Sequence, residues 1–167
     1  MQPPTNSTPE PLNYTALKHY PFTGYHFQVD FLLSKLNKPA NTRFEEISGG
    51  FSTAISYDGE GAGPPKSVYS DLVLKRGVVR DDTLLGWFND HRQSYSRLPI
   101  PVLVSVLDEE GKALMSWCFF NAYPVKWSTS GFHAGRAQVL YEEITLKYEF
   151  YRRVSARETA QLQDEIR

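Results

Sequence analysis

The stretch from Met115 to Trp127 constrains the fold more than any other part of the chain, because aromatic residues recur in it with the two-residue period of a β-strand. It reads Met-Ser-Trp-Cys-Phe-Phe-Asn-Ala-Tyr-Pro-Val-Lys-Trp. Asn121-Ala-Tyr-Pro124 interrupts the alternation, and Pro124 marks an edge, a bulge or a bend, because proline cannot donate a ladder hydrogen bond. The strand resumes at Val125–Trp127. Aromatic side chains bury large areas, so we expect the rest of the chain to pack around this bent strand.

Composition places the chain among ordinary globular proteins. It has 167 residues, 41% hydrophobic and 22% charged, enough for one domain with a core. A net charge of −1 gives no general attraction to nucleic acid, and no apolar run approaches the roughly 20 residues of a membrane helix. We therefore expect neither specific nucleic-acid binding nor stable membrane insertion. The single cysteine excludes an intrachain disulfide and favours a reducing compartment, and the N-terminus lacks the pattern of a secretory signal.

Period-2 alternation predicts further strands along the chain. They are expected at Tyr25–Leu33, Arg43–Ser48, Phe51–Tyr57, Val68–Lys75, Val102–Leu107 and Val139–Tyr151. In the first of these, His26, Gln28 and Asp30 are expected on the polar face. Gly49-Gly50 fits a bulge or sharp bend, and Asp108–Gly111 a tight turn.

One helix is predicted at Asp81–Tyr95, where apolar residues recur at helical spacing after a capping Asp81 or Asp82. Residues 1–19, rich in Pro, Ser, Thr and Asn, read as an extended arm. Residues 154–167 form a charged extension that could be a terminal helix. The predicted fold is therefore mainly β: an antiparallel β-barrel or sandwich over residues 20–153 with one packed α-helix.

Catalytic constellations are weak in this sequence. The four histidines form no metal-ligand spacing with another His, Cys or acid, and Cys118 lies in an aromatic strand without a local base. We expect no catalytic residue, no cofactor and no metal. Trp87, Trp117 and Trp127 could form a sugar-binding platform, although the alternation favours core packing for Trp117. A protein without a reactive site is expected to act through a surface or a shape.

An ordered set of motifs resembles a known family. The motifs are Tyr20-Pro21, Phe44-Glu-Glu-Ile-Ser-Gly49, Leu72-Val-Leu-Lys-Arg-Gly77, the helix with Trp87, Trp117 followed by Asn121–Trp127, and Glu142–Leu146 with Tyr148-Glu149. Together they resemble the tail tube proteins of contractile phage tails and of phage-tail-like contractile injection systems of the antifeeding-prophage type. They are similar, more remotely, to the secreted tube protein of type VI secretion.

The resemblance implies a tail-tube β-barrel whose six copies form a ring. It implies that rings stack into a hollow tube, that a contractile sheath drives the tube through a target envelope, and that baseplate and spike proteins are partners, with cargo in the lumen. It further implies assembly in the cytoplasm and a place in a phage tail or an extracellular tail-like particle.

Three sets of residues are candidates for these roles. The loop that would contact the next ring contains Asp58, Gly59, Glu60, Gly61, Pro64, Pro65 and Lys66. Candidates for the lumen wall are small or polar residues on two predicted strands, namely Ser52, Ala54, Ser56, Glu143, Thr145, Lys147 and Glu149. An outer, solvated face is the alternative for the last four. Core or subunit-contact candidates are Trp87, Trp117, Tyr123, Pro124 and Trp127.

The sequence departs from the family pattern in its loops and ends. The loop that would contact the next ring is shorter than the family's hairpin and rich in Gly and Pro. Gly50-Phe51 replaces a common Gly-Leu, and both termini extend beyond the usual ends. These changes would also suit a tube initiator, the ring that joins the tube to the baseplate spike. The alternative from a different class is a monomeric β-barrel that binds a small ligand or sugar through exposed tryptophans.

Overall fold

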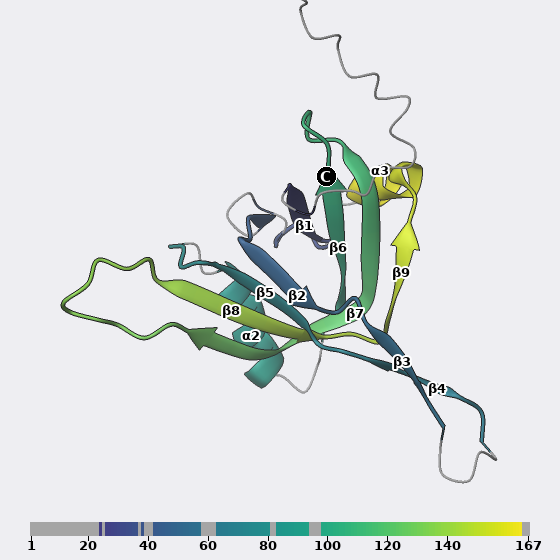
Figure 1. Cartoon of the computed structure of the whole chain (residues 1–167), viewed down its shortest axis with the longest axis horizontal. Coiled ribbons are helices and arrows are strands. Elements are labelled where there is room, and N and C mark those ends of the chain that lie inside the picture. Colours follow the sequence, from purple (N-terminus) through teal and green to yellow (C-terminus); the bar gives the residue numbers. More distant parts are fainter. Residues whose placement is uncertain are drawn as a thin grey trace, which may run out of the picture.

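A computed structural model describes residues 24, 26–36, 38, 42–57, 63–80, 83–93 and 98–164 of the chain. Within them, one antiparallel seven-stranded sheet curls around the core, a separate two-stranded hairpin projects from it, and two helices pack on it (Figure 1). The strands are β1 (Phe27–Phe31), β2 (Glu46–Gly49), β3 (Thr53–Ser56), β4 (Lys66–Tyr69), β5 (Leu72–Gly77), β6 (Ile100–Leu107), β7 (Ala113–Thr129), β8 (Tyr141–Lys147) and β9 (Phe150–Val154). The helices are α2 (Thr83–Gln93) and α3 (Ala156–Asp164). The predicted mainly β, antiparallel fold is confirmed.

Strand β7 joins the two halves of the curled sheet. Its first half lies between β6 and β9, with Val104 opposite Trp117, and its second half pairs with β8, with Trp127 opposite Ile144. The predicted bend is confirmed: Asn121 has a φ of 54°, and the register with β8 shifts just after Pro124. The predicted interruption of the strand is wrong, because β7 continues through the bend.

The main core lies inside the curl of the sheet. Alternate residues of the strands point inward and are buried together with Leu84 and Trp87 of α2. The strand members of this cluster are Val29, Phe31, Leu72, Leu74, Ile100, Val102, Val104, Phe119, Ala122, Ile144 and Leu146. The helix predicted at Asp81–Tyr95 is therefore confirmed over Thr83–Gln93, with its apolar stripe facing the core; the two capping candidates lie outside the described residues.

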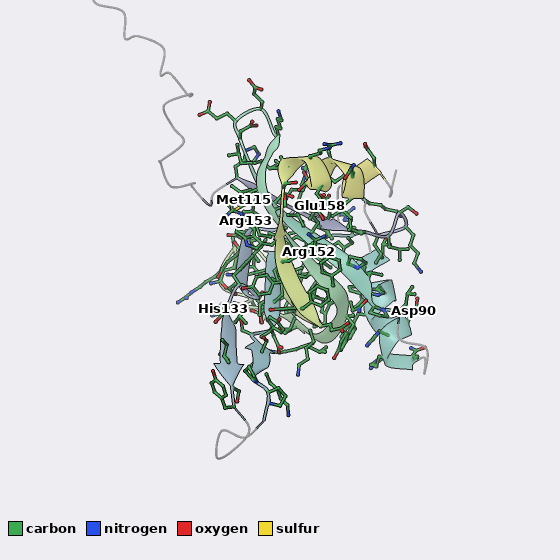
Figure 2. The ribbon with its side chains drawn as sticks, turned by 90° about the vertical axis from the view of Figure 1, so that its right-hand side faces the viewer. Asp90, Met115, His133, Arg152, Arg153 and Glu158 are labelled. Atoms are coloured by element: carbon green, nitrogen blue, oxygen red, sulfur yellow. The ribbon has the colours of Figure 1, made fainter. Side chains whose placement is uncertain are left out.

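Helix α3 covers the outer face of the sheet half made by β1, β6, the first half of β7, and β9. Leu162 packs against Leu103, Cys118 and Val154, which form a second, smaller apolar cluster. Ser155 Oγ accepts a hydrogen bond from the backbone N–H of Glu158, as in a helix capping box. Figure 2 shows Arg152 of β9 below Glu158 of α3, and the two side chains form an ion pair. The expected terminal helix is thus present.

The polar face predicted for the first strand is not exposed at Asp30. This residue is 2% exposed, and its carboxylate accepts hydrogen bonds from Gln28 Nε2 at 2.6 Å and from Gln163 Nε2 at 2.8 Å. The prediction was wrong because α3 covers this face, and the alternation within one strand carries no information about a helix over 120 residues away.

Two predicted strands are each divided in two. The stretch Val68–Lys75 belongs to β4 and β5, which separate at Ser70-Asp71. The stretch Val139–Tyr151 belongs to β8 and β9, which separate at Tyr148-Glu149. At the second break the N–H of Glu149 donates to the carbonyl oxygen of Phe120, so the chain turns from one half of β7 to the other.

A buried ion pair links β5 and β8 inside the curl. Arg76 and Glu142 face each other in the ladder, with Nε and Oε1 2.6 Å apart and side chains 3% and 8% exposed. The guanidinium also lies over the Phe44 ring, 5.5 Å from its centroid. Such a pair fixes the register of two neighbouring strands, because a one-residue slip would separate two buried charges.

Glu142→Ala is expected to lower the free energy of unfolding by about 3–5 kcal/mol, because it leaves the buried guanidinium without this carboxylate. The double variant Arg76→Met/Glu142→Leu is expected to recover most of that loss, since two apolar side chains replace the pair. Urea denaturation followed by tryptophan fluorescence measures both values. An unfolding free energy unchanged in the single variant would contradict the role given to the pair.

Candidate functional site

The hairpin formed by β3 and β4 is the part of the described chain that projects furthest from the curled sheet at one end (Figure 1). Its ladder runs from Thr53 opposite Tyr69 to Ser56 opposite Lys66. Ile55, Tyr57 and Val68 are 65%, 63% and 53% exposed. Because Val68 is opposite Ala54 and not opposite Ile55, it lies on the other face of the ribbon from Ile55 and Tyr57. The hairpin therefore presents apolar side chains on both faces.

Two glycines set the direction in which the hairpin leaves the sheet. Gly49 and Gly50 have φ values of 65° and 66°, a region that favours glycine. A Cβ on Gly49 would lie 2.1 Å from the carbonyl oxygen of Asp71, and one on Gly50 would lie 2.7 Å from Leu72 Cδ1. The sharp bend predicted at Gly49-Gly50 is thus confirmed, and no larger residue fits there.

Tyrosines fasten the root of the hairpin to the sheet. The Tyr148 hydroxyl is 2.8 Å from the carbonyl oxygens of both Gly50 and Ser70, one on each leg of the hairpin. Burial, with smaller contributions from Tyr151 and Tyr69, raises the pKa of Tyr148 to about 12, so the hydroxyl keeps its proton as a donor. Thr53 Oγ1 is 3.1 Å from the Tyr151 hydroxyl.

An aromatic cluster continues from this root into the core. The Tyr148 ring packs against Phe119 and Tyr69, with centroids 4.9 and 5.7 Å apart. Phe51, just before β3, packs edge-on against Trp117 and Phe119. The sequence alternation does not reveal Tyr148 as the residue that holds both legs, because its partners are backbone carbonyls 78 and 98 residues away.

The candidate residues for ring stacking and for the lumen divide between the hairpin and the sheet. Pro64, Pro65 and Lys66 lie on the exposed hairpin, whereas Asp58, Gly59, Glu60 and Gly61 lie outside the described residues. Ser52, Ala54 and Ser56 are exposed on the hairpin leg, which belongs to a different sheet from the lumen candidates on β8.

Those β8 candidates lie on the outer face of the sheet half made by β2, β5, β8 and the second half of β7. Glu143 is half-exposed and Lys147 is exposed, but Thr145 is only 8% exposed. Glu149 falls in the break after β8, where its carboxylate accepts a hydrogen bond from Asn121. The four therefore do not form one continuous row on a single strand, because that strand ends at Lys147.

The core and contact candidates are all engaged within the subunit. Trp87 is 4% exposed, Trp127 packs against Phe88 and the core, and Pro124 is buried. Tyr123 stacks on His91 of α2, with centroids 5.3 Å apart. None of the three tryptophans stands free as a sugar platform, since Trp117 also packs against the core and Phe51.

The described residues contain no group of three or more His, Cys, Asp or Glu side chains that could hold a metal ion. Figure 2 places Asp90 on α2 and His133 in the loop after β7 at opposite sides of the molecule. Cys118 is fully buried, and burial raises its pKa to about 11, which leaves the thiol protonated. No helix within the described ranges is long and apolar enough to span a membrane.

Comparisons with known proteins identify the family. The model of the family described as T4-like virus tail tube protein gp19 matches residues 23–152, so the chain belongs to this family of tail tube proteins. The matched residues include the hairpin, α2 and all of the curled sheet except Arg153 and Val154, whereas α3 lies beyond them. No curated protein sequence matches the chain.

Solved structures share the fold. The chain is similar to a chain of the sheath–tube complex of the extracellular contractile injection system PVC in its extended state, with a TM-score of 0.63, 21% identity, and coverage of 86% of this chain and 97% of that one. A chain of the anti-feeding prophage baseplate is similar with a TM-score of 0.62 and 24% identity, and the match covers 81% of this chain and 97% of that one. Hcp1 from Flavobacterium johnsoniae has a TM-score of 0.52 and 13% identity, and the match covers 77% of this chain and 94% of that one.

Tyr148→Phe is expected to loosen the hairpin while preserving the sheet. Loss of the hydroxyl removes hydrogen bonds worth about 1 kcal/mol, and the ring keeps its aromatic contacts. Hydrogen–deuterium exchange is expected to accelerate at Thr53–Ser56 and Lys66–Tyr69 and to stay unchanged in β6. Tyr141→Phe, which changes a tyrosine of β8 away from the hairpin, is the control. Equally accelerated hydrogen–deuterium exchange in both variants would contradict the role given to the Tyr148 hydroxyl.

Cys118 is expected to be unreactive in the folded chain. With a pKa near 11, the thiolate fraction at pH 8 is about one in a thousand, and the side chain is fully buried. Iodoacetamide at pH 8 is expected to leave the folded protein unlabelled and to label it completely in urea, as measured by intact mass. Rapid labelling without denaturant would show that the thiol is accessible.

Proposed function

We propose that the chain is the structural subunit of the inner tube of a contractile injection system or phage tail. Six copies form a ring, rings stack into a hollow tube, and contraction of a surrounding sheath propels the tube. The observation that carries this proposal is the projecting hairpin. The chain belongs to a tail tube family, and its hairpin presents apolar side chains on both faces. Its function is assembly, without catalysis or a cofactor.

An isolated two-stranded ribbon is marginally stable in water, and one that exposes Ile55, Tyr57 and Val68 exposes surface suited to a partner. In a stack, the hairpin of one ring would lie against the neighbouring ring, and its face with Ile55 and Tyr57 would be covered. Pro64, Pro65 and Lys66 would belong to this contact. Ser52, Ala54 and Ser56, on the other face of this leg, would stay near the water-filled bore.

Ring closure requires a heterologous contact, in which two different surfaces of the subunit meet. Among the described residues, β1 and β2 end the path of the sheet, and no strand pairs with the side of residues 123–129 that faces away from β8. Such edges carry unpaired backbone N–H and C=O groups and can pair between copies. Tyr123, Pro124 and Trp127 lie on one of these edges, so the contact would begin where the strand bends.

The remaining partners follow from the role. The tube would be assembled in the cytoplasm, where sheath, baseplate and spike proteins would contact it, and its lumen could hold cargo. The similar solved chains come from a sheath–tube complex and a baseplate, which supports these partners.

A second candidate is the tube initiator, the ring between tube and spike. Helix α3 favours it, because this helix lies beyond the residues matched by the family and adds a surface to the subunit. The number of copies in purified particles separates the candidates: an initiator forms one ring per particle, whereas a main tube subunit is as abundant as the sheath.

Electron microscopy of the concentrated chain is expected to show six-fold rings of uniform diameter, and at higher concentration stacks of them. The double variant Ile55→Ser/Tyr57→Ser is expected to form rings that no longer stack, because it removes the apolar face of the hairpin. Phe132→Ser/Val139→Ser removes comparable exposed apolar surface from the loop after β7 and is the control. A chain that stays monomeric in every condition, including with sheath and baseplate proteins, would refute the proposed function.

A further inference from the structure

The two halves of the curled sheet have different outer faces. The outer face of β1, β6, the first half of β7 and β9 is covered by α3, and its central residues Leu103 and Cys118 are fully buried. The outer face of β2, β5, β8 and the second half of β7 carries mostly polar side chains, and neither α3 nor its apolar cluster lies on it. We call this second surface the bare face.

Unlike charges are paired with one another across the bare face. Glu46 of β2 is opposite Lys75 of β5, and their Oε2 and Nζ atoms are 3.2 Å apart. Lys75 is opposite Glu143 of β8, and Glu143 Oε1 is 4.0 Å from Nζ of Lys126 on β7. The side-chain hydrogen bond to Glu46 raises the pKa of Lys75, so this lysine stays charged at neutral pH. Each of the four charges therefore has an unlike charge beside it within its own subunit.

The rest of the bare face does not disturb this balance. Lys147 and Glu149 are exposed at the end of β8 and add one charge of each sign. Because side chains two residues apart on a strand share a face, Ser48, Thr145 and Ser128 lie beside the charged residues and contribute hydroxyl groups. Acidic and basic side chains are thus equal in number on and beside this surface.

Ion pairs that water reaches contribute little to the stability of a subunit, so folding alone does not account for this arrangement. The pairing does determine the electric field above the surface. The fields of two unlike charges a few ångströms apart largely cancel at greater distances, and salt screens what is left within about 10 Å at 0.1 M. A polymer that moves along the bare face therefore meets neither a net attraction nor a net repulsion.

We propose that the bare face lines the bore as a charge-compensated wall, and that the cargo it fits is polypeptide of mixed charge. Binding of nucleic acid depends mainly on Lys and Arg side chains that neutralise phosphates, and the lysines of the paired set already face carboxylates. A strongly basic protein likewise finds no unpaired acidic surface to hold it. This inference rests on the proposed tube and names the class of cargo for its lumen.

Removal of the acidic partners is expected to convert the wall into a nucleic-acid-binding surface. Rings of E46Q/E143Q are expected to bind fluorescein-labelled oligodeoxythymidine at low salt about tenfold or more tighter than wild-type rings, because their lysines are then uncompensated. E109Q/E110Q removes two exposed acids from the turn before β7 and changes the net charge equally, so it is the matched control and is expected to bind like the wild type. Fluorescence anisotropy measures binding, and electron microscopy verifies the rings.

The single variant E143Q keeps this test decisive if the double variant does not assemble. Glu143 lies on β8, which has a paired strand on each side within the subunit. Its rings are expected to bind the oligonucleotide more tightly than wild-type rings, by less than the double variant would. Affinity equal to that of wild-type rings would overturn the proposal.

Removal of the basic partners is expected to have the opposite effect. Rings of K75Q/K126Q are expected to bind labelled polylysine about tenfold or more tighter than wild-type rings, because the carboxylates of the bare face are then uncompensated. K35Q/K112Q removes two exposed lysines from loops and is the matched control. Equal gains in the bare-face variant and in its control would show that net charge alone decides, which overturns the proposal.

The position of the bare face in the bore is tested by the size of a thiol reagent. K126C places a reactive thiol on this face, R157C places one on the exposed side of α3, and Cys118 is buried and does not compete. In intact tubes, small maleimides are expected to label both variants, whereas a maleimide on a long polyethylene glycol chain labels R157C alone. Labelling of K126C by the large reagent at the same rate as R157C would overturn the placement.

These outcomes separate the wall from the tube itself. Wild-type rings that bind oligonucleotide or polylysine as tightly as the matching glutamine variants overturn the charge-compensated wall and leave the proposed function intact. A wild-type chain that forms no ring under any condition refutes the proposed function, and the wall with it.

Discussion

The bend in β7 is the constraint on which the rest of the structure depends. A straight strand of 17 residues would have the same neighbours along its whole length, but this one pairs with β6 and β9 before the bend and with β8 after it. Asn121 supplies the positive φ, and Pro124 occupies a position beside a register shift, where its missing N–H costs least. Both sheet halves are therefore built on one continuous strand, and the curl that encloses the core follows from its bend.

The same bend gives the two halves their separate surfaces. Before it, the outer face of β7 carries Cys118, which α3 covers, and after it the outer face carries Lys126, which reaches Glu143. A single strand thus contributes to an apolar, helix-covered face and to a charged, open one. This division leaves one sheet half with an outer face open to water and covers the outer face of the other half with a helix.

Sequence reasoning predicted the faces of the strands better than their ends. Alternation favoured core packing for Trp117, and this residue packs against the main core. Alternation predicted one strand where the structure has β4 and β5, and one strand where it has β8 and β9. A period of two residues does not change when the pairing partner of the strand changes. The breaks depend on distant contacts, such as the Tyr148 hydroxyl with the carbonyl oxygens of Gly50 and Ser70, and no local pattern encodes these. The family resemblance supplied the assembly role, whereas the pairing of Lys75 with Glu143 across β5 and β8 required the register of the sheet.

The proposed assembly combines two kinds of contact that differ in their physics. Contact through strand edges is directional, because a shift by one residue moves every side chain to the opposite face. Contact through the hairpin is apolar and tolerates small changes of angle, since burial of apolar surface is non-directional. Strand-edge contacts would close each ring with a fixed geometry. Hairpin contacts could then add further rings to the stack. Because the glycines at 49 and 50 and the Tyr148 hydroxyl orient the hairpin from the sheet itself, the ring geometry would also set the direction of stacking.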